Sequence, residues 1–200
     1  MEAATVAHHE HHGPPPANRS SRVDPSLLGM LLFIGSEVMI FGAFFTAYFF
    51  IRVVGGADWP ADGDHLPKLI AGFNTAILVS SSFTLHFAQE AIRKDNRLGL
   101  QLGMVATFLL GATFLFIQIN EYVHIGFSPQ DHAQGSIFYG LTGLHGAHVT
   151  IGLMLLAVVT IRSFRGHYSS QAYRGMEVPG IYWHFVDVMW IIVYSSIYIL

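Results

Sequence analysis

Two histidines stand in a segment that is otherwise apolar enough to cross a membrane. His145 and His148 lie in LTGLHGAHVTIG, residues 141–152, and Glu37 lies in a second apolar segment. A charged side chain at bilayer depth costs about 2.5–3.5 kcal/mol near the helix centre on insertion scales. Such residues mark proton or ion pathways, ligand sites or hydrogen bonds between helices. The chemistry open to this set is therefore proton exchange, ligand binding or helix packing.

These three residues are expected at one depth. Glu37 lies ten residues into the first predicted span, which is about 15 Å at the helical rise. His145 and His148 lie about 12 and 17 Å from the outer end of the fourth predicted span. Their i, i+3 spacing puts both on one helix face. We expect Glu37 to meet the pair inside the bundle, directly or through water, so that a shared proton leaves no unpaired carboxylate. Packing alone, or a proton-linked or lipid-linked role, stays open.

A secondary polar set lies nearer the predicted membrane surfaces. His184 and Asp187 are again i, i+3 apart, in YWHFVD at the start of the last predicted span, on the cytoplasmic side. His86 and Glu90 end the second span on the same side, and Glu121 ends the third near the outer face. Interfacial depth costs less than the midplane, so hydrogen bonding between helices is the favoured interpretation of this set.

The sequence predicts no metal site and no cofactor in this chain. It has no cysteine, which excludes disulfides, iron–sulfur clusters and covalently attached c-type haem. A copper or zinc site needs three or four ligands, and no such cluster is visible. Axial haem ligands must face each other from two helices; only His86 with His184 leaves a b-type haem open. Neither a G-x-S-x-G nor an H-E-x-x-H motif indicates hydrolysis.

The composition is that of a membrane protein. Of 200 residues, 52% are hydrophobic and 12% charged, with a mean hydropathy of +0.46, whereas soluble domains carry about 25% charged residues. A spanning helix needs about 20 mostly apolar residues. We therefore predict an all-α polytopic protein in which residues 1–24 form a disordered, His-rich cytoplasmic tail and residues 25–200 form a bundle of five transmembrane helices. The spans are expected at about residues 27–51, 69–89, 98–122, 137–161 and 178–200.

Lysine and arginine predict the orientation. Eight of the ten lie on the side of the N-terminal tail and of the second and fourth connections, and only Arg52 and Lys68 lie opposite. By the positive-inside rule, the N-terminus is then cytoplasmic and the C-terminus extracytoplasmic. No basic block indicates nucleic-acid binding. Four cationic side chains on the cytoplasmic side are candidate contacts for phospholipid headgroups: Arg93, Arg97, Arg162 and Arg165.

Four motifs follow one another along the chain: FIGSEVMIFGAFFTAYF in the first span, INEYVH ending the third, GSIFYGLTGLHGAHVTIG entering the fourth and YWHFVDVMWIIVYSSIY in the last. They resemble those of subunit III of the haem-copper terminal oxidases, in particular the cytochrome c oxidase branch. Together with their spacing, they cover nearly all of residues 25–200.

The resemblance implies a non-catalytic subunit of a complex that reduces oxygen to water and pumps protons. Haem and copper would lie in partner subunits. This chain would pack mainly on subunit I, with subunits II and IV as further partners, in a bacterial plasma membrane. It would hold phospholipid and support proton uptake.

The family's functional residues map onto this chain. The family's carbodiimide-reactive glutamate falls on Glu37, its histidine pair on His145 and His148, and its WHFVD motif on residues 183–187. Longer relatives have seven spans, and this chain resembles a five-span form that starts at their third. The resemblance therefore implies that another subunit supplies the missing wall of the lipid cleft.

Two alternatives remain at this stage. Quinol oxidases and nitric oxide reductase gene clusters use related five-span subunits, although the SE and NEY residues favour the cytochrome c branch. The electron donor stays open. An independent proton-coupled transporter would also suit an acid and histidines at the midplane. The sequence shows neither the internal repeats nor the broken helices typical of such proteins.

Overall fold

The computed structural model describes residues 24–54, 66–169 and 173–200, and the described part contains helices and no strand. Five helices are long and apolar enough to cross a membrane. The prediction of an all-α membrane protein with five spanning helices is therefore confirmed. Their bounds are α1 Pro25–Phe49, continued by a π-helical turn Phe50–Val54, then α2 Lys68–Arg93, α3 Arg97–His124, α4 Ala133–Phe164 and α5 Arg174–Tyr194, continued by a π-helical turn Ser195–Ile199. The predicted tail lies outside the described residues except for Asp24.

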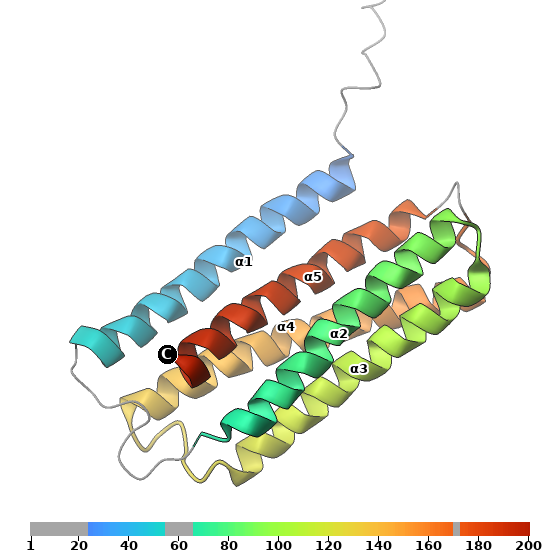
Figure 1. Ribbon diagram of the computed structural model, residues 1–200. Coiled ribbons are helices and arrows are strands. Elements are labelled where there is room, and N and C mark those ends of the chain that lie inside the picture. Colours follow the sequence, from blue (N-terminus) through green and yellow to red (C-terminus); the bar gives the residue numbers. More distant parts are fainter. Residues whose placement is uncertain (1–23, 55–65, 170–172) are drawn as a thin grey trace, which may run out of the picture.

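Four of the helices form a closed bundle and the fifth lies outside it. Helices α2, α3, α4 and α5 pack in a ring in which α5 returns to contact α2 (Figure 1). Helix α1 packs on the outside of this ring against α4 and α5. Only Phe41 and Tyr48 are buried on α1, so most of its apolar surface is exposed. An apolar exposed surface is the expected state of a helix that faces lipid or a partner within a membrane.

Side-chain caps begin three of the helices. The Asp24 carboxylate accepts from the Ser26 amide at 2.9 Å, and Asn96 and His132 make the equivalent bonds at the starts of α3 and α4. Each cap satisfies an amide that has no partner within its helix. Between α2 and α3 the chain turns tightly, and Asp95 has a φ of 56° there. This short turn makes α2 and α3 antiparallel neighbours.

The helices are longer than the apolar runs from which they were predicted, and this changes the depth of one acid. Helix α5 begins at Arg174, thirteen residues before Asp187, and the following turn ends at Ile199, twelve residues after it. At the helical rise, Asp187 thus lies about 20 Å from one end and about 18 Å from the other. The sequence placed His184 and Asp187 nearer one membrane surface; because polar residues before 178 extend the helix, Asp187 lies about midway between its two ends, and His184 lies nearer its start.

A tryptophan on α5 is enclosed by glycines of α3 and α4. Trp183 is fully buried, and its indole nitrogen donates to the Ser81 hydroxyl of α2 at 2.9 Å. A Cβ added to Gly111 or Gly152 would lie 2.5 or 2.7 Å from the indole ring. The absence of side chains at these two glycines therefore makes the space that the indole occupies, and this contact joins all four helices of the bundle.

Candidate functional site

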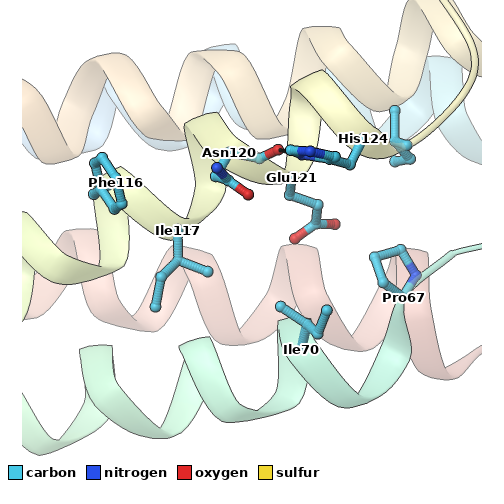
Figure 2. Close-up of a pocket in the computed structure, with 8 residues that line it drawn as sticks. Pro67, Ile70, Phe116, Ile117, Asn120, Glu121 and His124 are labelled. Carbon is cyan, nitrogen blue, oxygen red and sulfur yellow. Dashed lines mark hydrogen bonds between the residues drawn. The ribbon is translucent and has the colours of Figure 1, made fainter.

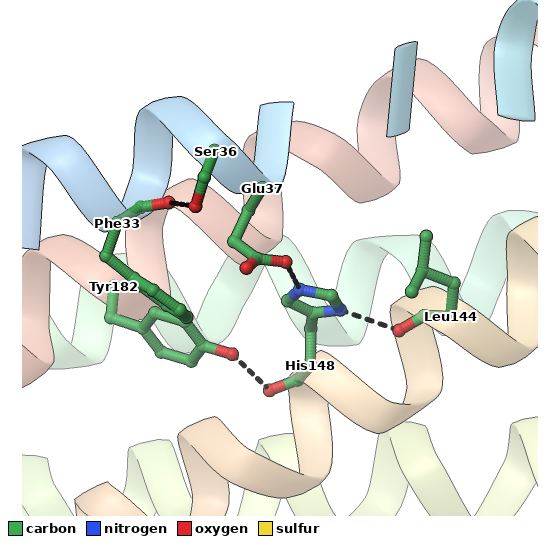
Figure 3. Close-up of polar contacts among 6 residues, drawn as sticks. All are labelled: Phe33, Ser36, Glu37, Leu144, His148 and Tyr182. Carbon is green, nitrogen blue, oxygen red and sulfur yellow. Dashed lines mark hydrogen bonds and ion pairs between the residues drawn. The ribbon is translucent and has the colours of Figure 1, made fainter. Parts of the chain in front are cut away.

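Glu37 of α1 and His148 of α4 form a buried pair between the outer helix and the bundle. Their Oε2 and Nε2 atoms are 2.8 Å apart, and the side chains are 13% and 8% exposed. Figure 3 shows Glu37 reaching from α1 onto the imidazole of His148. Among the described residues, no other side chain between Pro25 and Ala47 makes a hydrogen bond to another helix. The pair is thus the one polar connection at mid-depth between α1 and the rest of the described chain.

The hydrogen bonds of His148 determine which atoms of this pair can carry a proton. The Leu144 carbonyl lies 2.7 Å from Nδ1. Because a carbonyl only accepts, Nδ1 carries a hydrogen and donates it. The proton between Nε2 and Glu37 then belongs to either partner: a neutral imidazole accepts from a carboxylic acid, or an imidazolium donates to a carboxylate. Both states have the same net charge, so the pair can move a proton without placing an unpaired charge in the membrane.

Aromatic rings enclose the pair. Phe41 of α1 lies 5.1 Å from the His148 ring, and Phe185 and Tyr182 of α5 each lie 6.5 Å from it between ring centres. The Tyr182 hydroxyl donates to the His148 carbonyl at 3.3 Å, as Figure 3 also shows. These contacts hold the imidazole in one orientation and surround it with apolar surface, so the hydrogen bond to Glu37 is strengthened.

The structure does not bring His145 to Glu37. Its ring packs 4.7 Å from Trp190 and 5.8 Å from Phe114 between ring centres, inside the four-helix bundle. It is fully buried, and neither nitrogen has a hydrogen-bond partner among the described residues. Side chains three residues apart on a helix point in directions that differ by about 60°. This difference is enough for His148 to face α1 while His145 faces the inside of the four-helix bundle. The expected hydrogen-bonded set of three is therefore a pair, Glu37 with His148.

A second acid and histidine meet between α2 and α5. The Ser82 hydroxyl donates to Oδ2 of Asp187 and lies 2.9 Å from Nδ1 of His184. Asp187 is 4% exposed, and its Oδ1 has no partner among the described residues. His86, on α2, lies near enough to His184 for their charges to interact. The predicted pair His184 and Asp187 is thus joined by Ser82, one of three serines whose sequence favoured bonding to their own helix backbone.

The end of the bundle where α3 ends and α2 and α4 begin holds a third acid. Oε1 of Glu121 accepts from the Tyr198 hydroxyl at 2.7 Å, and Oε2 has no partner among the described residues. Glu121 is 6% exposed and lines a cavity of about 510 Å³ between α2 and α3. Figure 2 shows its carboxylate pointing toward Pro67 and Ile70 on the opposite side of this cavity.

Removing the Tyr198 hydroxyl is expected to destabilise this end of the bundle. Tyr198→Phe leaves a buried carboxylate oxygen unpaired, at a cost of about 1–3 kcal/mol. The temperature at which helicity is lost in mild detergent, followed by circular dichroism, measures the effect. Tyr194→Phe is the matched control, because the neighbouring Tyr194 hydroxyl makes no hydrogen bond to a described residue. Equal stability of the two variants would contradict a structural role for the Tyr198–Glu121 bond.

An arginine joins the C-terminal end of α1 to the end of the last helix. Arg52 donates to the Tyr48 hydroxyl at 2.6 Å, to the Ser196 carbonyl at 3.3 Å and to the Leu200 carbonyl. Tyr48 also donates to the Ser196 carbonyl. Helix α1 is thus held at two places, by this group at its end and by Glu37 in its middle. The sequence analysis did not single out Tyr48 or Ser196.

The remaining predicted residues lie at the opposite end, where α2 and α4 end and α3 begins. Glu90 is half exposed and pairs with Lys94 at 3.2 Å and with Arg93 at 4.0 Å. Arg93 also stacks over the ring of Tyr173, so part of its guanidinium group is already in contact within the chain. The four candidate headgroup contacts all have exposed side chains at this end: Arg93, Arg97, Arg162 and Arg165.

The three consecutive serines of α2 bond to different partners. Ser80 and Ser81 bond to their own helix backbone, whereas Ser82 bonds across to α5. The spacing of Ser82, His86 and Glu90 at four-residue intervals was a signal for one polar face on α2.

In residues 24–54, 66–169 and 173–200, no group of three or more histidine, aspartate or glutamate side chains is arranged to hold a metal ion.

Comparison with known proteins gives one consistent result. A model of the family described as cytochrome c oxidase subunit III matches residues 19–200, which include every described residue. Cytochrome c oxidase subunit 3 of Thermostichus vulcanus is 41% identical over 178 residues, 88% of this chain and 88% of that protein. The protein of that name from Synechocystis is 42% identical over 194 residues, 96% of this chain and 79% of that protein. The one from Lumbricus terrestris is 40% identical over 176 residues, 85% of this chain and 68% of that protein.

Proposed function

The chain belongs to the cytochrome c oxidase subunit III family, and from this premise we propose that it is the non-catalytic subunit III of a haem-copper cytochrome c oxidase. It packs on subunit I, with subunits II and IV as further partners, and supports proton uptake while the complex reduces oxygen to water. Haem and copper belong to the partner subunits. The observation that carries this proposal is the buried Glu37–His148 pair, which can exchange a proton at mid-depth.

The geometry of the pair suits a supporting role. The net charge of the pair is the same whether the shared proton lies on Glu37 or on His148. When a neighbouring group is protonated, this proton can therefore move from one partner to the other at little electrostatic cost. Neither Glu37 nor His148 joins a third acid or histidine among the described residues. The pair therefore supports a proton-holding function better than a continuous channel through this chain.

Lipid binding and orientation are part of the same proposal. The exposed arginines Arg93, Arg97, Arg162 and Arg165 lie at one end of the bundle, where cations attract anionic headgroups at about 1 kcal/mol each. With the positive-inside rule, this end is cytoplasmic in a bacterial plasma membrane, and the Glu121 cavity faces outward. The exposed apolar surface of α1 is then available for lipid or for another subunit.

Affinity purification of the tagged chain from its native membrane in mild detergent tests the proposal. We expect an optical spectrum of haem, a copper signal and at least two larger subunits to co-purify. When the chain is separated from them, the spectrum should remain with the larger subunits. A haem spectrum retained by the isolated chain would make His86 and His184 candidate ligands and would contradict a non-catalytic role. Purification of the chain without haem or partners would favour an independent transporter.

The electron donor is tested on the same preparation. The relatives are subunits of cytochrome c oxidases, so oxygen consumption is expected with reduced cytochrome c. Turnover with a quinol alone would assign the complex to the quinol oxidase branch instead.

A further inference from the structure

We propose that His184, Ser82 and Asp187 form a proton relay that loads a buried acid from the arginine-rich end of the bundle. The arginine-rich end is the end of the bundle that carries Arg93, Arg97, Arg162 and Arg165. The relay adds a proton-storage site separate from Glu37 and His148, and its physiological meaning rests on the proposed role in proton uptake.

The hydrogen bonds give the relay a direction. Ser82 has a single hydroxyl hydrogen, and it donates that hydrogen to Oδ2 of Asp187. Its contact with Nδ1 of His184 at 2.9 Å must therefore be one in which the imidazole donates and the serine oxygen accepts. The three groups thus form an ordered chain of donors from the histidine to the carboxylate.

A proton can pass along this chain without movement of its heavy atoms. When His184 is an imidazolium, its Nδ1 hydrogen passes to the Ser82 oxygen as the serine hydrogen passes to Asp187. The products are a neutral imidazole with its hydrogen on Nε2, an unchanged serine hydroxyl and a carboxylic acid. One positive and one negative charge are replaced by two neutral groups, so protons and charge balance.

An entrance lies at the histidine end. A cavity of about 230 Å³ opens between the starts of α1 and α5 and the end of α2, and it is lined by Leu27, Gln89, Arg93, Glu177, Ile181 and His184. A space of this size with several polar lining groups can hold water. The charged and titratable groups near the relay are His86 and Arg93 from α2 and Glu177 from α5, while α1 contributes only Leu27.

The acid end is closed. Asp187 is 4% exposed and lies in the middle of its helix, and its Oδ1 meets no partner among the described residues. A proton delivered to Asp187 therefore has no onward donor or acceptor in the described chain. The arrangement suits reversible storage of one proton, with release by the path of entry.

Infrared spectroscopy of the purified complex tests the relay. A step to lower pH should produce the carbonyl band of a protonated carboxylic acid that shifts in D₂O and is absent from Asp187→Asn. Ser82→Ala should slow the appearance of this band by about tenfold or more, since it removes the bridging hydroxyl. Ser82→Thr keeps a hydroxyl and should retain the wild-type rate. Ser80→Ala is the packing control, because Ser80 bonds only its own backbone.

Two results would overturn the relay. One is a wild-type complex without a titrating band that depends on Asp187, a measurement that needs no serine variant to assemble. The other is a band that forms at the wild-type rate in Ser82→Ala. These outcomes concern protonation of one side chain, whereas the proposed function fails if haem-bearing partners do not co-purify, so the two failures are distinguishable.

Discussion

Replacement of Glu37 by alanine is expected to leave assembly and the initial rate of oxygen reduction largely intact and to cause loss of activity during sustained turnover. The side chain joins α1 to the bundle at mid-depth. Its removal leaves Nε2 of His148 unpaired, at a cost of about 1–3 kcal/mol for an unsatisfied buried polar group. The group around Arg52 still holds the C-terminal end of α1. The complex should therefore form, with a loosened contact at its middle.

Oxygen consumption followed from the first seconds through many turnovers measures this effect. Glu37→Gln separates the two roles of the side chain, because an amide still donates or accepts a hydrogen bond with His148 but cannot exchange a proton. Decay in both variants assigns the effect to proton exchange, and decay in alanine alone assigns it to the contact between helices. Immediate loss of all activity in a fully assembled complex would contradict the supporting role itself.

The parts of the structure that follow from local rules could be predicted from the sequence. Apolar runs of sufficient length identified the five helices, and counting the helical rise placed Glu37 level with His148. Longer helix ends were missed because polar residues such as those before 178 continue a helix beyond its apolar run. The position of Asp187 about midway along its helix follows from the same extension.

The choice between neighbouring side chains depended on packing that no spacing rule contains. His145 and His148 have equivalent surroundings in the sequence, but His148 faces α1 and His145 packs against Trp190. Similarly, Ser82 is one of three consecutive serines, and only the rotation of α2 against α5 decides that it meets Asp187. Among side chains within about one helical turn, tertiary contacts therefore decide which one enters the site.

The largest loss of stability is expected from Trp183→Ala. The indole is fully buried, donates to Ser81 of α2 and fills the space beside Gly111 and Gly152. Truncation of a buried aromatic side chain to alanine costs about 3–5 kcal/mol, through lost contacts and the cavity that remains. The midpoint of thermal loss of helicity, measured in the detergent-solubilised complex alongside retention of this subunit, should fall accordingly.

Gly152→Val should also destabilise the complex, because its Cβ would lie 2.7 Å from the indole and overpacking costs about 1–3 kcal/mol. Gly143→Val is the control on the same helix, since nothing described lies within 4 Å of a Cβ added there. In the double variant of Trp183→Ala with Gly152→Val, the valine enters space that the indole has left. The combined loss should therefore be smaller than the sum of the single losses, because residues in contact are not additive. Strict additivity would mean that the two positions do not share the space that the structure gives them.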